Sequence, residues 1–188
     1  EFAPTEPQKL LDRMYAPQFR LEQARAFVWG QQPTLANFRP DLLHTRQEEL
    51  DFFFRLARLR RYGLKYFRDG TMLPPPQLDT PTQEIDISRV SIYAGRREAL
   101  THYRKTCPTV LSAAWLAPDG DVAVVFVNIS SETQSFSVRL PRKAYFLKHK
   151  NVMRVVESEN CWDECRTDTS AKDIVVTVTL LPCEARLY

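Results

Sequence analysis

Four cysteines and three histidines have the side chains best suited to redox, metal or nucleophilic chemistry. The sequence allows two disulfides in three pairings, or free thiols, among Cys107, Cys161, Cys165 and Cys183. Three residues separate Cys161 from Cys165, so the pair is not the C-x-x-C of redox proteins. A zinc ion there would need two more ligands, and only His149 and Cys183 are available. We therefore expect no metal site and no cofactor.

Other catalytic and nucleotide-binding motifs do not occur in the sequence. The three histidines fall in separate segments without H-E-x-x-H spacing, and there is no G-x-S-x-G nucleophile elbow. With five glycines, the chain has neither G-x-G-x-x-G nor G-x-x-x-x-G-K-[ST], which excludes the phosphate loops built on them. Asn128 and Ser130 form an N-glycosylation sequon at the end of an expected strand, a triplet that is common by chance.

The composition is that of a globular chain with a sizeable core. Of 188 residues, 44% are hydrophobic, and no apolar run approaches the roughly 18 to 20 residues of a membrane span. The 26 basic and 23 acidic residues leave a net charge of +3, too small to require a nucleic-acid partner. We expect no membrane and no nucleic-acid partner. No targeting peptide is visible in residues 1–10, and the cellular compartment stays open.

Residues 1–76 are predicted to form a helical segment. A capping box at 5–8 opens a short helix, and the apolar run 23–29 reads as a short buried strand ending at Gly30. From Asp41, apolar residues recur near the helical period, which predicts an amphipathic helix over 41–67 that is weakest at Gly63. Its arginine-rich stretch 58–61 favours a solvated face over an anion site.

After prolines 74–76, a stiff connector and a natural domain boundary, the hydrophobic period changes to two. A Pro-Asp-Gly-Asp turn at 118–121 joins two of the expected strands. Strands are predicted at 110–116, 121–128, 135–140, 144–147, 152–156 and 174–181. Short strands at this spacing are typical of an antiparallel sandwich, here over residues 84–188, so the fold class is α+β.

The helical segment cannot close a core by itself, and a strand followed by an amphipathic helix is the unit of parallel sheets and barrels. Residues 24–33, the long helix and residues 66–70 resemble the end of a glycoside-hydrolase-type (β/α)8 barrel. Residues 111–115, 117–121 and 124–129 resemble the opening hairpin of the sandwich that follows such barrels. The chain is therefore similar to the C-terminal portion of a glycoside-hydrolase-like protein from a poorly characterised bacterial family.

The resemblance implies that residues 1–76 are the last part of the barrel, and that the sandwich is an accessory or structural domain. Glycoside hydrolysis needs two carboxylates at the barrel's C-terminal face. The expected strand carries no acid at its C-terminal end, Glu22 lies at its wrong end, and Asp69 follows the helix. No residue here is assigned a catalytic role; the acids would lie upstream of Glu1, and the parent protein would be the hydrolase.

The resemblance also implies a substrate-binding role at the end of the expected strand. Trp29 would stack on a sugar face while Gln31 and Gln32 hydrogen-bond its hydroxyl groups. The competing interpretation, which the apolar run favours, makes Trp29 a large core residue. The sugar, the linkage and the stereochemical course stay open.

Two further functions are compatible with the sequence: a structural interaction module, and a carbohydrate-binding module that presents Trp115, Tyr145 and Trp162 on the sandwich. The 41–67 helix adds an expectation about assembly. It carries more apolar side chains than one narrow stripe holds, namely Phe52, Phe53, Phe54, Leu56 and Leu59. We expect self-association through this helix unless the sandwich covers it.

Overall fold

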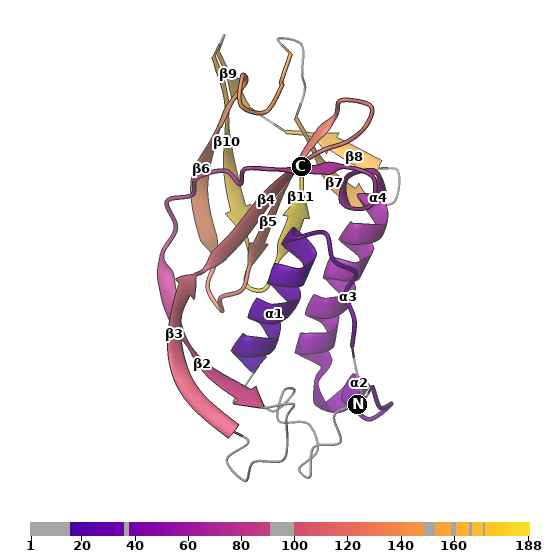
Figure 1. The fold of residues 1–188 in the computed structure, drawn as a ribbon, viewed down its shortest axis with the longest axis vertical. Coiled ribbons are helices and arrows are strands. Elements are labelled where there is room, and N and C mark those ends of the chain that lie inside the picture. The colour runs from indigo at the N-terminus through magenta and orange to yellow at the C-terminus, as the bar shows by residue number, and fades with distance from the viewer. Residues whose placement is uncertain are drawn as a thin grey trace.

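The computed structural model describes residues 16–35, 38–90, 100–148, 153–158, 161–165, 167–170 and 172–188. The capping box predicted at 5–8 lies outside these residues. Helices come first along the described chain (Figure 1): α1 (Ala16–Val28), α2 (Leu42–Thr45), α3 (Gln47–Tyr62) and α4 (Leu64–Phe67). None of the described helices is long and apolar enough to cross a membrane.

The strands pair antiparallel throughout the described residues. One sheet, called the central sheet below, has the order β1 (Thr71–Leu73), β4 (Val110–Leu116), β5 (Val122–Asn128) and β11 (Ala185–Leu187). The outer sheet has the order β6 (Gln134–Pro141), β10 (Asp173–Leu180) and β9 (Asp168–Thr169). Two hairpins complete the fold: β2 (Thr82–Val90) with β3 (Leu100–Pro108), and β7 (Arg154–Ser158) with β8 (Cys161–Glu164).

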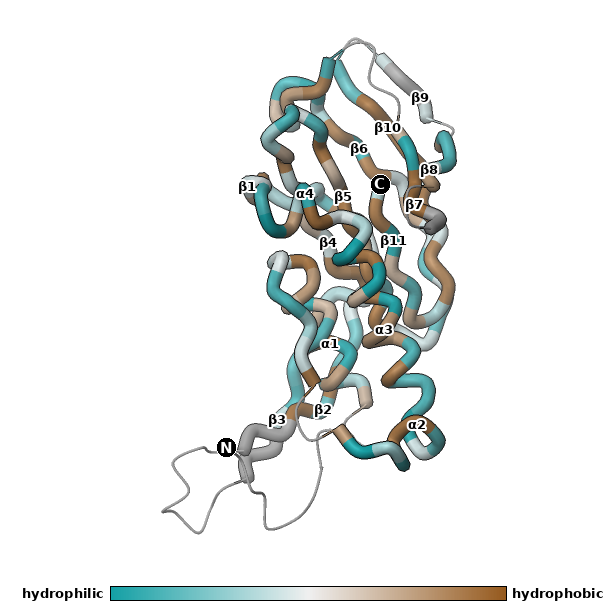
Figure 2. The backbone as a smooth tube through the Cα atoms, turned by 90° about the vertical axis from the view of Figure 1, so that its right-hand side faces the viewer, coloured by the Kyte–Doolittle hydropathy of each residue, from teal (hydrophilic) through white to brown (hydrophobic). Residues whose placement is uncertain are grey.

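The central sheet is buried on both faces. On one face, Val125 and Leu187 share a core with Phe27 of α1 and Leu56 of α3, and on the other Phe126 packs with residues of the outer sheet. The arrangement is three layers, helices on sheet on sheet (Figure 1). Burial on both sides explains why β5 is an almost unbroken apolar run, seen as a brown stretch in Figure 2. The predicted antiparallel sandwich and the α+β class are confirmed.

Residues 23–28, predicted as a strand, belong to helix α1, so that prediction is wrong. The buried side chains of α1 include Leu21, Ala24, Phe27 and Val28, which recur at the helical spacing of three and four. Of the residues between them, Glu22 and Arg25 are exposed, whereas Gln23 and Ala26 are half-buried. The apolar stretch was too short for its period to separate strand from helix, and packing against the central sheet decides for the helix.

The amphipathic helix predicted over 41–67 is present as α2, α3 and α4. The break at Gly63 was expected; the chain also breaks at Arg46, between α2 and α3. A Cβ atom on Gly63 would lie 2.8 Å from side-chain atoms of both Leu187 and Phe67. The missing side chain therefore lets the α3–α4 corner pack directly on the central sheet.

The sandwich covers much of the apolar face of α3. Phe52, Leu56 and Leu59 are buried in the core, Phe53 is half-buried, and Phe54 is 39% exposed. The condition attached to the self-association prediction, coverage of this face by the sandwich, is thus met for three of the five side chains. Association of the isolated chain stays a prediction.

The predicted strands at 110–116, 121–128, 135–140 and 174–181 are present as β4, β5, β6 and β10. Of the strand predicted at 152–156, residues 154–156 fall in β7. The prediction at 144–147 is wrong, because residues 142–146 form a turn. Tyr145 is the apolar anchor of that turn: its ring is buried and its hydroxyl donates to the Pro74 carbonyl at 3.1 Å.

The chain joins the central sheet before it reaches the prolines. Strand β1 ends at Leu73, and its residue Met72 is paired with Trp115 of β4. Helices and sandwich are therefore linked by strand pairing as well as by packing. The division into domains at 1–76 and 84–188 stays a prediction.

Candidate functional site

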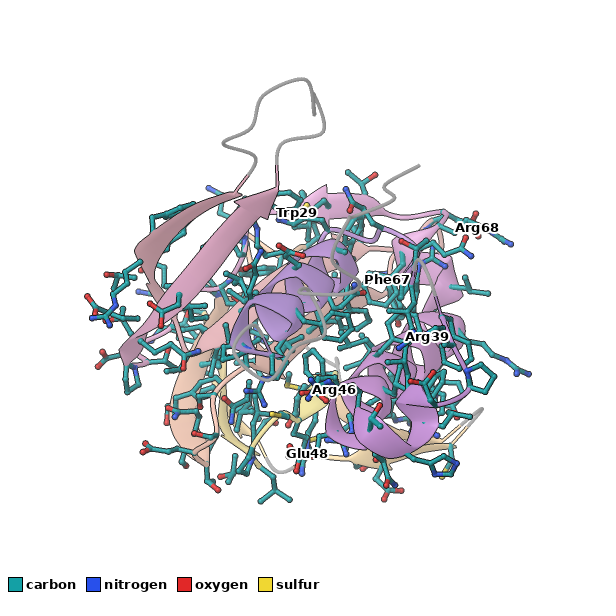
Figure 3. All side chains as sticks on the ribbon, turned by 90° about the horizontal axis from the view of Figure 1, so that it is seen from below. Trp29, Arg39, Arg46, Glu48, Phe67 and Arg68 are labelled. Carbon is teal, nitrogen blue, oxygen red and sulfur yellow. The ribbon has the colours of Figure 1, made fainter. Side chains whose placement is uncertain are left out.

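The C-terminal end of α1 is fixed to the central sheet by Trp115. Its indole Nε1 donates to the Val28 carbonyl at 3.2 Å, which satisfies one of the acceptors that a helix end leaves open. The ring of Phe67 lies between, with centroids 5.1 Å from Phe27 and 5.8 Å from Trp115. This aromatic cluster supports the residues that follow the helix; Figure 3 labels its member Phe67 and Trp29, the first residue after α1.

Gly30 ends the helix in a conformation that other residues rarely adopt. Its φ is +73°, and a Cβ atom there would lie 2.8 Å from the Trp115 ring. Its N–H donates to the Phe27 carbonyl at 2.9 Å, and the N–H of Gln31 donates to the Ala26 carbonyl at 2.9 Å. These are the features of a glycine-terminated helix, and they turn the chain outward at residue 31.

The three predicted binding residues lie together on this exposed turn. Trp29 is 50% exposed, so its interpretation as a core residue is wrong. Gln31 and Gln32 are exposed as well. The guanidinium of Arg25 lies 4.9 Å from the centroid of the Trp29 ring, a cation–π contact that orients the indole. The turn thus offers an aromatic surface beside two amides.

The two carboxylates considered above, Asp69 and Glu22, each accept hydrogen bonds from a neighbouring side chain. Asp69 accepts two hydrogen bonds from Arg68, which hold the pKa of Asp69 below its ordinary value. A general acid needs the opposite shift. Glu22 lies within α1, where its carboxylate accepts a hydrogen bond from Gln18 at 2.8 Å.

A second acidic pair, Asp119 and Asp121 in the β4–β5 turn, binds Lys65 of α4 at 2.9 and 2.5 Å. Burial opposes the charge on Lys65, but its hydrogen bonds to both carboxylates outweigh that effect, and its pKa lies above the ordinary value. The pKa of Asp119 is lowered by the N–H of Asp121 and by Lys65. The two ion pairs join α4 to the hairpin.

The histidines and cysteines do not gather into a metal site in the part of the chain that the structure describes. His44 is exposed on α2, the side chain of His102 is not described, and His149 lies outside the described residues. The four cysteines are free thiols, which was one of the alternatives left open.

Thiol reactivity should follow burial. Burial raises the pKa of the Cys107 thiol, with an opposing effect from Lys105, whereas Cys161 is exposed. A raised pKa means less thiolate at pH 8, so we expect Cys107 to react with Ellman's reagent at least about tenfold more slowly than Cys161. Mass spectrometry after timed quenching would identify each modified residue, with the unfolded chain in urea as control. Equal rates for the two thiols in the folded protein would contradict the burial of Cys107.

The sandwich aromatics do not form an exposed binding face. Trp115 is 7% and Tyr145 5% exposed, and Trp162 is partly buried against the core that contains the helices. A carbohydrate-binding module of the kind considered above would need at least two of them coplanar on the surface. Here two of the three are structural.

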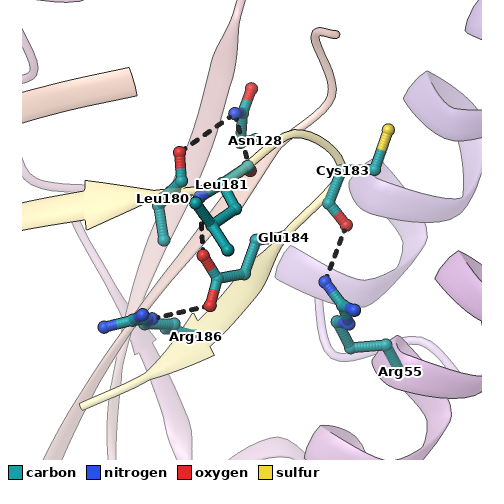
Figure 4. A network of polar contacts seen from close by, with 7 residues as sticks. All are labelled: Arg55, Asn128, Leu180, Leu181, Cys183, Glu184 and Arg186. Atoms are coloured by element: carbon teal, nitrogen blue, oxygen red, sulfur yellow. Dashed lines mark hydrogen bonds and ion pairs between the residues drawn. The ribbon is translucent and has the colours of Figure 1, made fainter. Parts of the chain in front are cut away.

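Asn128 was noted only as a sequon, and the structure shows a buried polar network instead (Figure 4). Its Nδ2 donates to the carbonyls of Glu132 at 2.7 Å and Leu181 at 2.9 Å. Its Oδ1 accepts from the N–H and hydroxyl of Ser130 at 3.0 and 2.7 Å. The side chain is fully buried and cannot carry a glycan in this fold. The sequence feature that could have indicated this network is a polar residue, Asn128, at the end of an otherwise apolar strand.

The decisive comparison concerns the middle of the chain. Residues 99–158 match the glycosyl hydrolase family 30 beta sandwich domain. The match contains β3 to β7 and confirms the predicted likeness to a C-terminal portion of a glycoside-hydrolase-like protein. It does not reach the helical segment, so the barrel is not shown. Neither the curated proteins nor the solved structures yield a match.

Proposed function

We propose that this chain is the C-terminal portion of a carbohydrate-active hydrolase, with the family 30 sandwich as an accessory domain and the catalytic carboxylates upstream of Glu1. The match over residues 99–158 is the observation that carries this proposal. The electrostatics agree with it, since Asp69 and Asp119 have lowered pKa values, unlike a general acid.

In this proposal residues 1–76 are the last part of a (β/α)8 barrel. Of the strand and helix expected at the end of such a barrel, the described residues provide the amphipathic helix α3, whereas residues 23–28 are helical, so this part of the proposal depends on the neighbouring match over residues 99–158. The coding sequence upstream of Glu1 tests this directly. It should encode about 250 residues of alternating strands and helices, and a sequence without that alternation would refute the barrel.

Residues 29–32 follow a helix and not the expected strand, so the substrate role now depends on exposure alone: we propose that the exposed turn of Trp29, Gln31 and Gln32 contacts the substrate. The indole is exposed and oriented, and the turn rests on the rigid Trp115 cluster. Such a contact contributes to binding without taking part in bond cleavage.

Replacing Trp29 with alanine in the complete protein should raise KM about tenfold and leave kcat within about twofold. An aromatic stacking contact of about 1.4 kcal/mol corresponds to that factor. Tyr103→Ala is the matched control, since Tyr103 is an aromatic residue of similar exposure, 47%, on the β2–β3 hairpin. Unchanged KM in the Trp29 variant, or an equal effect in both variants, would remove the turn from the substrate site.

A further inference from the structure

A cleft of about 400 Å³ lies where α3 meets the edge strand β11 and the β7 strand, and its lining includes none of residues 29–32. It is lined by Arg55, Arg58, Leu59, Tyr62, Val155, Val156, Glu184, Ala185 and Arg186. Leu59, Val155, Val156 and Ala185 are buried and form its apolar part. The volume is in the range of small-ligand sites.

Arginines from two separate elements line this cleft. Arg55 and Arg58 are three residues apart on α3 and therefore on the same side of the helix, and Arg186 comes from β11. The single acid in the lining is Glu184, so the lining has a formal charge of +2. The positive charges of these arginines repel one another, and an anion bound between them would offset that repulsion.

The internal partners of these groups leave the excess charge uncompensated (Figure 4). Glu184 uses one carboxylate oxygen to accept from Arg186 Nε at 2.9 Å and the other to accept from the Leu181 N–H at 2.6 Å. Arg55 donates to a neutral group, the Cys183 carbonyl, at 3.2 Å.

Arg58 is the group most available to a ligand. It is exposed, and it takes part in none of the hydrogen bonds or ion pairs found among the described residues. A guanidinium has five N–H donors in a planar arrangement that suits two oxygens of an anion. The sequence favoured a solvated face for the arginine stretch 58–61. Because α3 packs against β11, one of these arginines, Arg58, instead lines a cleft with an excess of positive charge.

We propose that this cleft binds a small ligand through an oxyanion group, a carboxylate, sulfate or phosphate, with Arg58 as its principal donor and Arg55 and Arg186 supplying positive charge. The proposal goes beyond the hydrolase function and does not depend on it, because it needs no catalytic residue and no contact at Trp29.

The test is calorimetric titration of the 188-residue chain with sodium sulfate, sodium phosphate and sodium malonate, at constant ionic strength set with chloride. We expect saturable 1:1 binding of at least one of these anions, and the preferred anion separates tetrahedral from carboxylate ligands. Arg58→Gln should weaken that binding at least about tenfold, and Arg58→Lys should weaken it less.

Arg139→Gln is the matched control, because Arg139 is an exposed arginine on β6 outside the cleft and its loss changes the net charge equally. It should bind as the unaltered protein does. Equal weakening in Arg58→Gln and Arg139→Gln would reduce the effect to net charge and overturn the proposal. So would the absence of saturable binding for all three anions while circular dichroism shows the chain folded.

Discussion

Replacing Asn128 with alanine is expected to destabilise the protein by about 3 kcal/mol. The substitution removes the partner of the buried Ser130 N–H and of the buried Leu180 carbonyl, at about 1 to 3 kcal/mol for each orphaned group, and also the bond to the Leu181 carbonyl. Urea unfolding followed by circular dichroism measures the loss, with the m-value checked for constancy.

Ser131→Ala is the control for the Asn128 substitution. Ser131 is the exposed neighbour in the same turn, and its loss should change stability by less than about 0.5 kcal/mol. A loss below about 1 kcal/mol for Asn128→Ala would mean that the network does not fix the ends of β5 and β10. Asn128 would then again be a candidate for N-glycosylation.

Replacing Leu56 with alanine should cost about 2 to 5 kcal/mol. Leu56 has no exposed surface and lies in the core that joins α3 to the central sheet. Thermal and urea unfolding should show a single transition at lower stability, because the helices and the sandwich share that core.

Phe54→Ala separates packing within the chain from packing between chains. Phe54 is 39% exposed on the same helix, and its loss should cost less than about 1 kcal/mol. Light scattering on the unaltered chain should give 21.9 kDa if the sandwich covers α3 as the structure shows. A dimer dissociated by Phe54→Ala would instead support association through the 41–67 helix.

The elements predicted correctly are those with strong local signals. The β4–β5 hairpin has a Pro-Asp-Gly-Asp turn between strands of clear apolar character, and α3 has a long apolar period with Gly63 at its end. Such signals act within a few residues and do not depend on the rest of the fold.

Strands β2 and β3 were missed although each has nine residues and they pair with each other, whereas the other missed elements depend on distant partners or are very short. The apolar residues of α1 fit a strand as well as a helix until Trp115 and Phe67 provide a surface for one face. Tyr145 gave a strand-like pattern, yet it anchors a turn. Strands β9 and β11 have two and three residues, too few to show a period.

The Trp29 turn and the arginine cleft also differ in how far they could be predicted from local sequence. Trp29, Gln31 and Gln32 are consecutive or nearly so, and their grouping could be predicted from the chain, although the exposure of Trp29 could not. The cleft brings Arg58 to Arg186, from elements far apart in the sequence. Only the docking of α3 against β11 places the two side chains in one lining.

The most direct test of the proposed function compares turnover by two proteins on a panel of aryl glycosides. The complete protein, with the residues upstream of Glu1, should release the aryl group from at least one substrate, whereas the 188-residue chain should release none above a buffer control. Turnover by the 188-residue chain that persists through purification and is not a contaminant would contradict the account, because it would place the catalytic carboxylates within these residues.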